Sequence, residues 1–419
     1  MTSLDFGLLP IILFCVGLAA AIFVCGPGLA KTRRVGHRLP TASLPVDMPE
    51  PAEGLNGNDA DATAGVKSPA QADGPLPGAD VTVVVYAFAA IDYLDTYLER
   101  LMSQSLRGFR VVLVYDAGAE ATAMLSERYA GVYPDLYITF VPPGSHNLSR
   151  RKLALTIGIK AATTGIVVTT TSNCDIPSVY WLEELTAPLR DDADVKIALG
   201  YSHYSFDELH GPGKWYRQFD HTVTSIQWLG SALGGRPYRG DRFNLAYRRD
   251  LFFDSRGFYT SLDLESGEDD IFVNDYAEAS NTRVAVSPQS MLTTLWGHSA
   301  GRMWVDQKER YDFNRRWLPA RPFIFEGMTS AARLAALGCL AASAFVALPS
   351  IVPAAAALAV TVAWWGIEIA AYRRAAARLE AVRLWWALPL FRLWRPLGNL
   401  IFKARHYRDR YRNFNYIGS

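Results

Sequence analysis

Charged residues are missing from two long stretches of the chain, and this pattern predicts membrane helices on both sides of a polar region. No residue from Phe6 to Ala30 carries a charge, and none from Leu334 to Gly366 does. About 20 apolar residues are enough to cross the ~30 Å hydrocarbon core of a bilayer. We therefore expect both stretches to lie in a membrane.

The first stretch, residues 6–30, is expected to be an uncleaved transmembrane anchor. A secretory signal peptide is the alternative, but its basic residues would precede a shorter apolar run. Here the chain starts with MTSLDFG, and the basic segment KTRRVGHR, Lys31–Arg38, follows the run. The positive-inside rule places this basic end in the cytosol.

The second stretch is too long for one straight span, because an unbroken helix over it would be about 50 Å long. Pro349 and Pro353 would break such a helix near its middle. We expect a transmembrane helical hairpin over residues 328–372. Arg333 would snorkel at one end, and Glu368 is unfavourable near the other.

The hairpin also returns the basic segment YRRAAAR, Tyr372–Arg378, to the side of the first basic segment. A single span would place these arginines outside, against the positive-inside rule. Residues 373–419 then mix tryptophan, leucine and phenylalanine with arginine, which is typical of an amphipathic interfacial tail facing the cytosol. A further full span is the alternative, and Arg392 and Arg395 argue against it.

Residues 31–80 are expected to be a basic flank and a flexible linker, since residues 39–80 contain no aromatic residue and few large apolar ones. Residues 81–325 then alternate between strand-like and helix-like patterns and should form the soluble domain. The expected strands cover residues 81–88, 109–117, 136–142 and 165–171, and the expected helices cover 93–106, 122–132 and 149–163. This alternation predicts a parallel sheet with helices on both faces, and such sheets bind ligands beyond the carboxyl ends of their strands.

Composition excludes several classes of function. Lysine and arginine total 42 and aspartate and glutamate total 41, so the charge balance gives no reason to expect nucleic-acid binding. The four cysteines form no Cys-x-x-Cys, which argues against a disulfide framework or a zinc site. The sequence also lacks the glycine-rich motifs of dinucleotide-binding folds and of P-loop kinases.

Polar residues lie where a ligand of the predicted sheet would bind. Asp116 ends the second strand and could contact a nucleoside, although a turn residue is the alternative. Arg150–Lys152 open the next helix, where cations oppose the helix dipole; binding an anionic diphosphate would explain them, and a solvated basic turn is the alternative. The fourth strand ends in Ser172–Asp175, where a sugar-nucleotide enzyme would place a metal-binding Asp-x-Asp.

Two later motifs add candidate chemistry. In ESGEDDIFVNDY, one of the acids Glu268–Asp270 could deprotonate a hydroxyl group, whereas helix capping is the alternative. In WVDQKERYDFNRRW, Gln307 and Arg310 lie one helical turn apart and could clamp a pyrophosphate, unless the helix is merely exposed and amphipathic. His298 could be a core histidine, a phosphate donor or a third metal ligand.

Taken in order, these motifs resemble the family-2 glycosyltransferases, inverting enzymes of the GT-A fold, and in detail a membrane-anchored bacterial branch. The resemblance covers about Val81–Arg316 and is carried by VTVVVYAF with LERLMSQSL, VVLVYDAG, SRRKLALTIGIKAATTGIVVTTTSNCD, GRPYRGDRFNLAYRR, SGEDDIFV and QKERY. It implies an α/β fold of the GT-A type, a Rossmann-like mixed sheet with helices on both faces, joined to transmembrane helices at both ends.

The resemblance also implies roles for single residues. Asp269 would be the catalytic base, and Asp116 and Lys152 would bind the donor. Asn173 and Asp175 would bind the donor diphosphate through Mg²⁺ or Mn²⁺.

The remaining implied roles concern the metal and the acceptor. His298 would join Asp175 as a metal ligand. Gln307, Arg310 and Tyr311, which match a Gln-x-x-Arg-Trp motif, would bind the acceptor or the phosphate together with Glu268 and Asp270.

The chain departs from the family pattern in ways that bear on the metal and the base of the nucleotide. The first strand ends in Tyr86–Phe88, where the family has an acid that grips the nucleobase, and Tyr311 replaces a tryptophan. An alignment on Pro177 and Trp181 would place Ser172 and Cys174 at the two Asp positions, and a thiol is a poor ligand for a hard cation.

The sequence therefore predicts a multi-pass protein of the inner or plasma membrane with a cytosolic catalytic domain. It would move a sugar from a UDP- or GDP-sugar donor to a lipid-linked or cell-surface glycan acceptor, with inversion. A processive polysaccharide synthase and a catalytically inactive GT-A scaffold are the alternatives.

Overall fold

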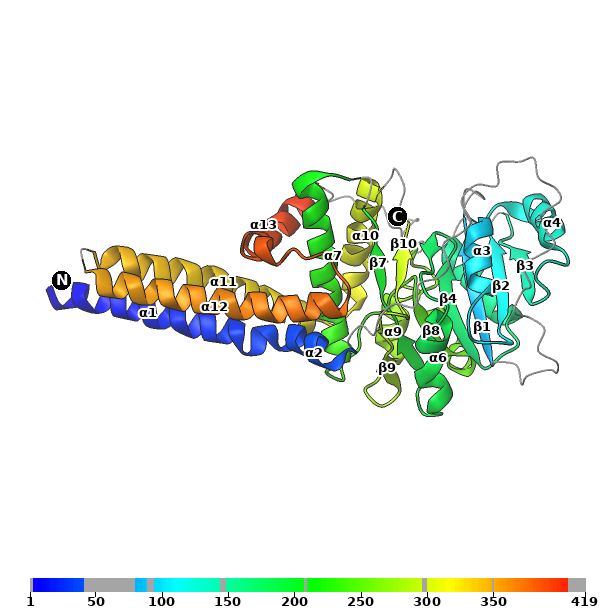
Figure 1. The fold of residues 1–419 in the computed structure, drawn as a ribbon, viewed down its shortest axis with the longest axis horizontal. Coiled ribbons are helices and arrows are strands. Elements are labelled where there is room, and N and C mark those ends of the chain that lie inside the picture. Colours follow the sequence, from blue (N-terminus) through cyan, green and yellow to red (C-terminus); the bar gives the residue numbers. More distant parts are fainter. Residues whose placement is uncertain are drawn as a thin grey trace, which may run out of the picture.

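The computed structural model describes residues 3–40, 80–88, 94–143, 148–206, 209–295, 300–348 and 350–405. Most of the expected linker and His298 lie outside these ranges. A mixed α/β domain sits at one end of a rod of three long helices (Figure 1).

A seven-stranded sheet of order β3-β2-β1-β4-β8-β6-β9 organises the domain. Its strands are β1 (Val81–Ala87), β2 (Arg110–Tyr115), β3 (Leu136–Phe140), β4 (Ile166–Thr171), β6 (Ile197–Leu199), β8 (Leu245–Arg248) and β9 (Thr282–Val284). The first four are parallel, as the alternating pattern predicts, whereas β8 is antiparallel to both β4 and β6. The sheet is therefore mixed. A smaller sheet of order β5-β10-β7 joins β5 (Cys174–Asp175), β7 (Ser202–Tyr204) and β10 (Leu292–Thr294).

Helices cover both faces of the large sheet, and two buried apolar clusters fill the two interfaces. The domain helices are α3 (Leu94–Met102), α4 (Gly118–Tyr129), α5 (Arg150–Ala161), α6 (Trp181–Asp191), α7 (Gly211–Ala232), α8 (Arg249–Asp254), α9 (Asp270–Tyr276) and α10 (Ala300–Asn314). On one face, Val84 of β1 packs in a cluster with Leu155 of α5 and Phe219 of α7. On the other face, Val83 packs in a cluster with Leu98 of α3. A central strand buried on both faces explains the unbroken apolar run of β1.

Three helices form the rod: α1 (Ser3–Cys25) continues into α2 (Ala30–Arg38), and α11 (Ala320–Val346) and α12 (Ile351–Arg378) form the hairpin (Figure 1). Residues Leu8–Arg38 and the two hairpin helices are each long and apolar enough to cross a membrane. The break between α11 and α12 falls between Val346 and Ile351, close to the predicted position, and Pro353 lies in the first turn of α12, where proline is tolerated. The domain boundary differs, since α11 starts inside the expected residues 81–325.

Arg333 and Glu368 do not behave as the sequence suggests. Arg333 does not snorkel: its Nε lies 3.0 Å from Glu368 Oε1, and both side chains are buried between the helices. The Trp364 Nε1 donates to the same carboxylate at 2.9 Å. The unfavourable glutamate is thus paired within the bundle.

The basic flank is helical: residues 30–38 form α2, which packs on α7 of the domain and on α12. A Cβ on Gly230 of α7 would lie 2.5 Å from the Lys31 carbonyl oxygen, so only glycine permits this approach. On the other side, Gly36 approaches Ala375 of α12. Helix α2 therefore lies between the domain and the hairpin and contacts both.

The tail contains a helix, α13 (Leu388–Arg405), which lies beside α7 and α10 (Figure 1). Its basic residues Arg392 and Arg395 face the protein, whereas Leu390, Trp394 and Leu397 are exposed. An apolar face turned outward is typical of a helix that lies in a membrane interface.

Candidate functional site

The expected donor edge is built from the ends of β1 and β2 and the start of α5. The Tyr86 hydroxyl donates to Asp116 Oδ2 at 2.7 Å, and the Arg150 Nε lies 2.9 and 3.1 Å from the two Asp116 oxygens. The cation that opposes the dipole of α5 is therefore paired with a carboxylate of the chain itself. Asp116 stays at the edge of the sheet but is already engaged.

Lys152 is placed differently from the donor-binding role that the resemblance implies. It is fully buried, and its Nζ donates to the carbonyl oxygens of Leu264 at 2.9 Å and Ser266 at 2.8 Å, and also to that of Ser261. Burial lowers the pKa of Lys152 to about 8. This lysine holds the loop that precedes the acidic motif.

The place of the Asp-x-Asp lies on β5. Cys174 is buried against the core, whereas Asn173 and Asp175 on either side are partly exposed, as strand alternation requires. The Asn173 Oδ1 accepts from the Thr171 hydroxyl at 2.5 Å, and Asp175 forms an ion pair with Arg100. Cys174 therefore does not face the edge where a metal would sit.

The acidic motif lies in a shell of arginines. Gly267 has a φ of +109°, a conformation that side chains disfavour, and it turns the chain so that three consecutive acids are buried. The Glu268 Oε1 lies 2.7 Å from Arg151 Nε and 3.3 Å from Arg242 Nη2. Burial alone would raise the pKa of Glu268, but these two arginines outweigh it and hold the pKa at about 2.

Asp270 is paired in the same manner. Its carboxylate lies 3.1 Å from Arg239 Nε and accepts from Asn314 Nδ2 at 3.0 Å. Burial, which Arg239 only partly offsets and Asp269 reinforces, raises the pKa of Asp270 to about 6. Glu268 and Asp270 thus organise the motif through internal pairs, which differs from the expected contact with phosphate or acceptor.

Asp269 has one side-chain partner among the described residues, whereas Glu268 and Asp270 each have two. Its Oδ1 accepts from Arg310 Nη1 at 2.7 Å, while its Oδ2 has no hydrogen-bond partner among the described residues. Its backbone lies beside Gly240, in the loop that leads into β8. Since β8 is antiparallel to β4, this loop and Asp269 belong to the edge where β4 ends.

Helix α10 supplies the other half of the site, as the one-turn spacing predicts. Arg310 holds Asp269 rather than pointing free toward a phosphate, and one turn later Asn314 holds Asp270. The guanidinium carbon of Arg239 lies 4.0 Å from the centre of the Tyr311 ring. Gln307 is only 3% exposed, and neither atom of its amide has a partner among the described residues.

Sequence reasoning did not assign roles to the loop between α7 and β8, although its residues shape the site. It supplies Arg239 and Arg242 to the acidic motif. Its Asp241 accepts from the Ser202 amide and hydroxyl, both at 2.8 Å. Burial raises the pKa of Asp241 to about 6. The close spacing of Arg239, Asp241 and Arg242 was the available sequence signal for this part of the site. The hydrophobic periodicity of the chain did not indicate which residues they contact.

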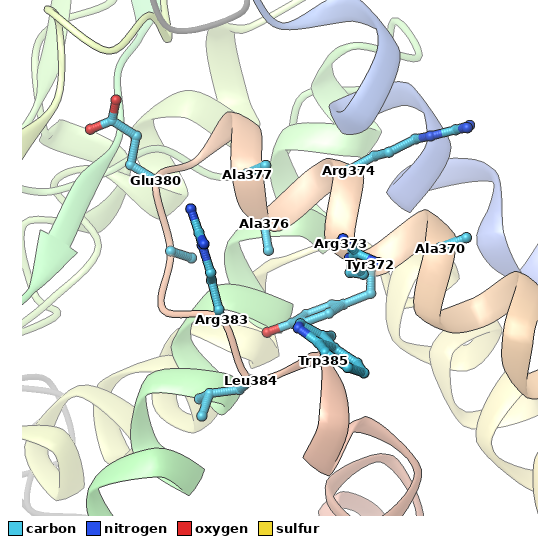
Figure 2. A pocket seen from close by; sticks show the side chains of 11 residues that line it. Ala370, Tyr372, Arg373, Arg374, Ala376, Ala377, Glu380, Arg383, Leu384 and Trp385 are labelled. Carbon is cyan, nitrogen blue, oxygen red and sulfur yellow. The ribbon is translucent and has the colours of Figure 1, made fainter. Parts of the chain in front are cut away.

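A cavity of about 550 Å³ adjoins this site. Gln307, Tyr311 and Arg239 line its inner end, and α11 and α13 close its other side. A second cavity, of about 850 Å³, lies at the end of α12, with Arg373, Arg383 and Trp385 around it (Figure 2). Two candidate site residues, Gln307 and Tyr311, line the first cavity, and none lines the second. We therefore assign the first cavity to the site.

Few of the described side chains could bind a divalent cation. No three His, Cys, Asp or Glu side chains are grouped to hold a metal within the described ranges. The expected place offers one carboxylate, Asp175, and one amide oxygen, from Asn173, and both already have partners. His298 lies outside the described residues. The residues that are described do not form a metal site by themselves.

No protein-family model and no curated protein matches the sequence. Among solved structures, the chain is similar to a mannosyltransferase from Pyrobaculum calidifontis in complex with GDP-Man and Mn²⁺, at 18% identity and a TM-score of 0.48, over 93% of this chain and 99% of that one. It is also similar to glucosyl-3-phosphoglycerate synthase from Mycobacterium tuberculosis in complex with Mn²⁺, UDP and glucosyl-3-phosphoglycerate, at 16% identity and a TM-score of 0.31, over 51% of this chain and 70% of that one. At these scores, the function of this chain must rest on its own residues.

Proposed function

We propose that the protein is a membrane-bound glycosyltransferase that transfers a sugar from a nucleotide-sugar to an acceptor hydroxyl, with inversion. The observation that carries the proposal is Asp269: a buried carboxylate with one oxygen held by Arg310 of α10 and the other without a partner among the described residues. The same helix contributes Gln307 and Tyr311 to the lining of the first cavity. An oriented carboxylate with one free oxygen suits a general base.

In the proposed reaction, Asp269 Oδ2 takes the proton of the acceptor hydroxyl as that oxygen attacks the anomeric carbon. The bond between the sugar and the diphosphate breaks on the opposite side, and the diphosphate leaves with the bonding electron pair. Arg310 keeps the base oriented through the contact between its Nη1 and Asp269 Oδ1. Asp175 and Asn173 would hold a Mg²⁺ or Mn²⁺ ion, and this ion would supply charge neutralisation for the leaving diphosphate.

The membrane placement is also a proposal. Three helices able to span a bilayer and the outward apolar face of α13 support an inner or plasma membrane location. Basic residues at the domain end of α2 and α12 support a cytosolic domain, because the positive-inside rule favours basic residues on that side. Such a domain would receive a UDP- or GDP-sugar from the cytosol and a lipid-linked or glycan acceptor from the membrane side.

The proposal is tested by nucleotide-sugar hydrolysis and transfer with the purified full-length protein. D269N should lower the rate by about 10²–10⁴, which is the usual contribution of a general base. E268Q is the matched control, because Glu268 is a neighbouring buried carboxylate paired with arginines, and its loss removes no base.

An equal loss in both variants would contradict the assignment of Asp269 as the base. Failure of the unmodified protein to hydrolyse or transfer from any UDP- or GDP-sugar would favour a catalytically inactive scaffold. Products longer than one added sugar would instead identify a processive synthase.

A further inference from the structure

The cavity beside the site contains a buried cation without an anionic partner. Arg392 of α13 lines this cavity and is only 5% exposed. Its Nε has no hydrogen-bond partner, and Arg392 takes part in no ion pair of the described residues. Its guanidinium carbon lies 5.9 Å from the centre of the Phe219 ring, which supplies no charge. A buried charge without a partner is unfavourable, so this arginine calls for a ligand.

The neighbouring cations do not share this property. Arg395 is paired with Asp220 at 2.8 Å and with Glu326, and Lys308 is paired with Asp220 at 3.1 Å. Arg333 is paired with Glu368. The acids around the cavity are therefore already satisfied by other residues. Burial and repulsion from Arg333 lower the pKa of Arg392 to about 10. These effects outweigh the attraction of Glu368 and Glu326, neither of which forms an ion pair with Arg392 among the described residues, and a bound anion would relieve this cost.

The other side chains that line the cavity indicate which further groups a ligand of Arg392 would carry. Its lining includes Leu334 of α11 and Leu400 of α13 on the membrane side, and Leu400 is largely exposed on the outward face of α13. The buried amide of Gln307, with neither atom satisfied, lies at the catalytic side. The lining thus combines apolar side chains, a cation without an ion-pair partner among the described residues, and a polar amide on α10, the helix that also carries Arg310.

We propose that this cavity binds the phosphate head group of a membrane amphiphile, with Arg392 as its cationic contact and the chain of the amphiphile directed along α13 into the membrane. The inference rests on the proposed function, because this amphiphile would be the acceptor. Arginine suits the task, since its planar fork of donors matches phosphate oxygens.

Direct binding to the full-length protein in phosphatidylcholine nanodiscs tests the inference. The probes are hexadecyl phosphate, hexadecanol and inorganic phosphate. Hexadecyl phosphate should bind more tightly than either other probe, and R392Q should weaken its binding about tenfold or more, as expected for loss of a buried charged hydrogen bond. The matched control is R383Q, which removes an exposed arginine of the second cavity (Figure 2).

Each contrary outcome is decisive. Equal binding by R392Q and the unmodified protein would overturn the role of Arg392. Equal binding of inorganic phosphate would point to a free anion, and equal binding of hexadecanol would point to the apolar chain alone.

A diazirine-labelled alkyl phosphate gives a second measurement that needs no variant. It should crosslink to α10, α11 or α13, and crosslinks only elsewhere would overturn the inference. Donor hydrolysis needs no acceptor, so hydrolysis without amphiphile binding would overturn this inference and leave the proposed function standing.

Discussion

Replacing Glu368 by glutamine should destabilise the three-helix bundle more than replacing Arg333 by glutamine. The two charges lie 3.0 Å apart, with a second contact at 3.3 Å, and both side chains are buried. At an effective dielectric constant of 20, this separation corresponds to about 5 kcal/mol of attraction. The attraction offsets the desolvation of the two ions, so the pair is stable only while both members are present.

The asymmetry follows from the chemistry of the groups. E368Q leaves a guanidinium that cannot give up its proton, so the full penalty of breaking a buried pair, about 3–5 kcal/mol, should appear. R333Q leaves a carboxylate that still accepts from Trp364 Nε1, so its effect should be smaller, about 1–3 kcal/mol. The double variant R333M/E368M removes both charges and should be less destabilised than E368Q.

Thermal unfolding of the detergent-solubilised full-length protein provides the assay, with the order of unfolding temperatures as the readout. R373Q is a suitable control, since Arg373 is an exposed arginine of the same helix hairpin. If R333M/E368M unfolds at a lower temperature than both single variants, or if the single variants are harmless, then the two residues do not stabilise the bundle as a pair.

Three further predictions concern the domain. Burial raises the pKa of Asp270 to about 6, above the ~3.9 of an unfolded chain, so stability is lost as the pH rises from about 4 through 6 and changes little at higher pH. Raising the pH from 5 to 7.5 should therefore lower the stability of the unmodified protein by about 1 kcal/mol relative to D270N, and parallel pH profiles would contradict this. K152M leaves buried carbonyl oxygens without a donor, so it should destabilise the domain by about 3 kcal/mol and speed amide hydrogen exchange in residues 261–266. K160M, on the exposed face of α5, should change neither the stability nor the exchange. In Mn²⁺ titrations of donor hydrolysis, D175N should raise the half-saturating concentration and R100Q should lower it, because Arg100 competes with the metal for Asp175; unchanged titrations would exclude Asp175 as a ligand.

Local pattern was sufficient wherever a residue's environment is set by its neighbours along the chain. The apolar runs that became β1, β2 and β4 and the break between α11 and α12 depend on sequence-local preferences for burial and on proline geometry. The one-turn spacing of Gln307 and Arg310 likewise predicted that both lie on one face of α10, and both side chains are buried there. The antiparallel β8 was not predicted, because four residues between a loop and α8 give too short a pattern to show direction.

Partners distant in the sequence were beyond such reasoning. The cations at the start of α5 suggested a ligand, yet Arg150 and Arg151 are paired with Asp116 and Glu268, and the latter pair joins residues more than a hundred positions apart. Lys152 looked like a third free cation until three backbone carbonyl oxygens surrounded it. Charge at a helix start signals that an anion is needed, but the fold decides whether that anion is a ligand or a side chain.

The buried groups that have no internal partner among the described residues are therefore the best candidates for contacts with a ligand. The chain supplies internal partners for Glu268 and Asp270, so burial of charge in this domain is ordinarily matched. Asp269 Oδ2 and Arg392 remain without such partners in the part of the chain that the structure describes. Arg392 lines the first cavity, and α10, which holds Asp269 through Arg310, contributes Gln307 and Tyr311 to the same lining. A carboxylate oxygen that lacks a donor and a guanidinium that lacks an anion call for opposite ligand groups, a hydroxyl and a phosphate. One acceptor that carries both groups would satisfy the two residues together, which is why the base and the membrane-side cation should be tested as parts of one binding site.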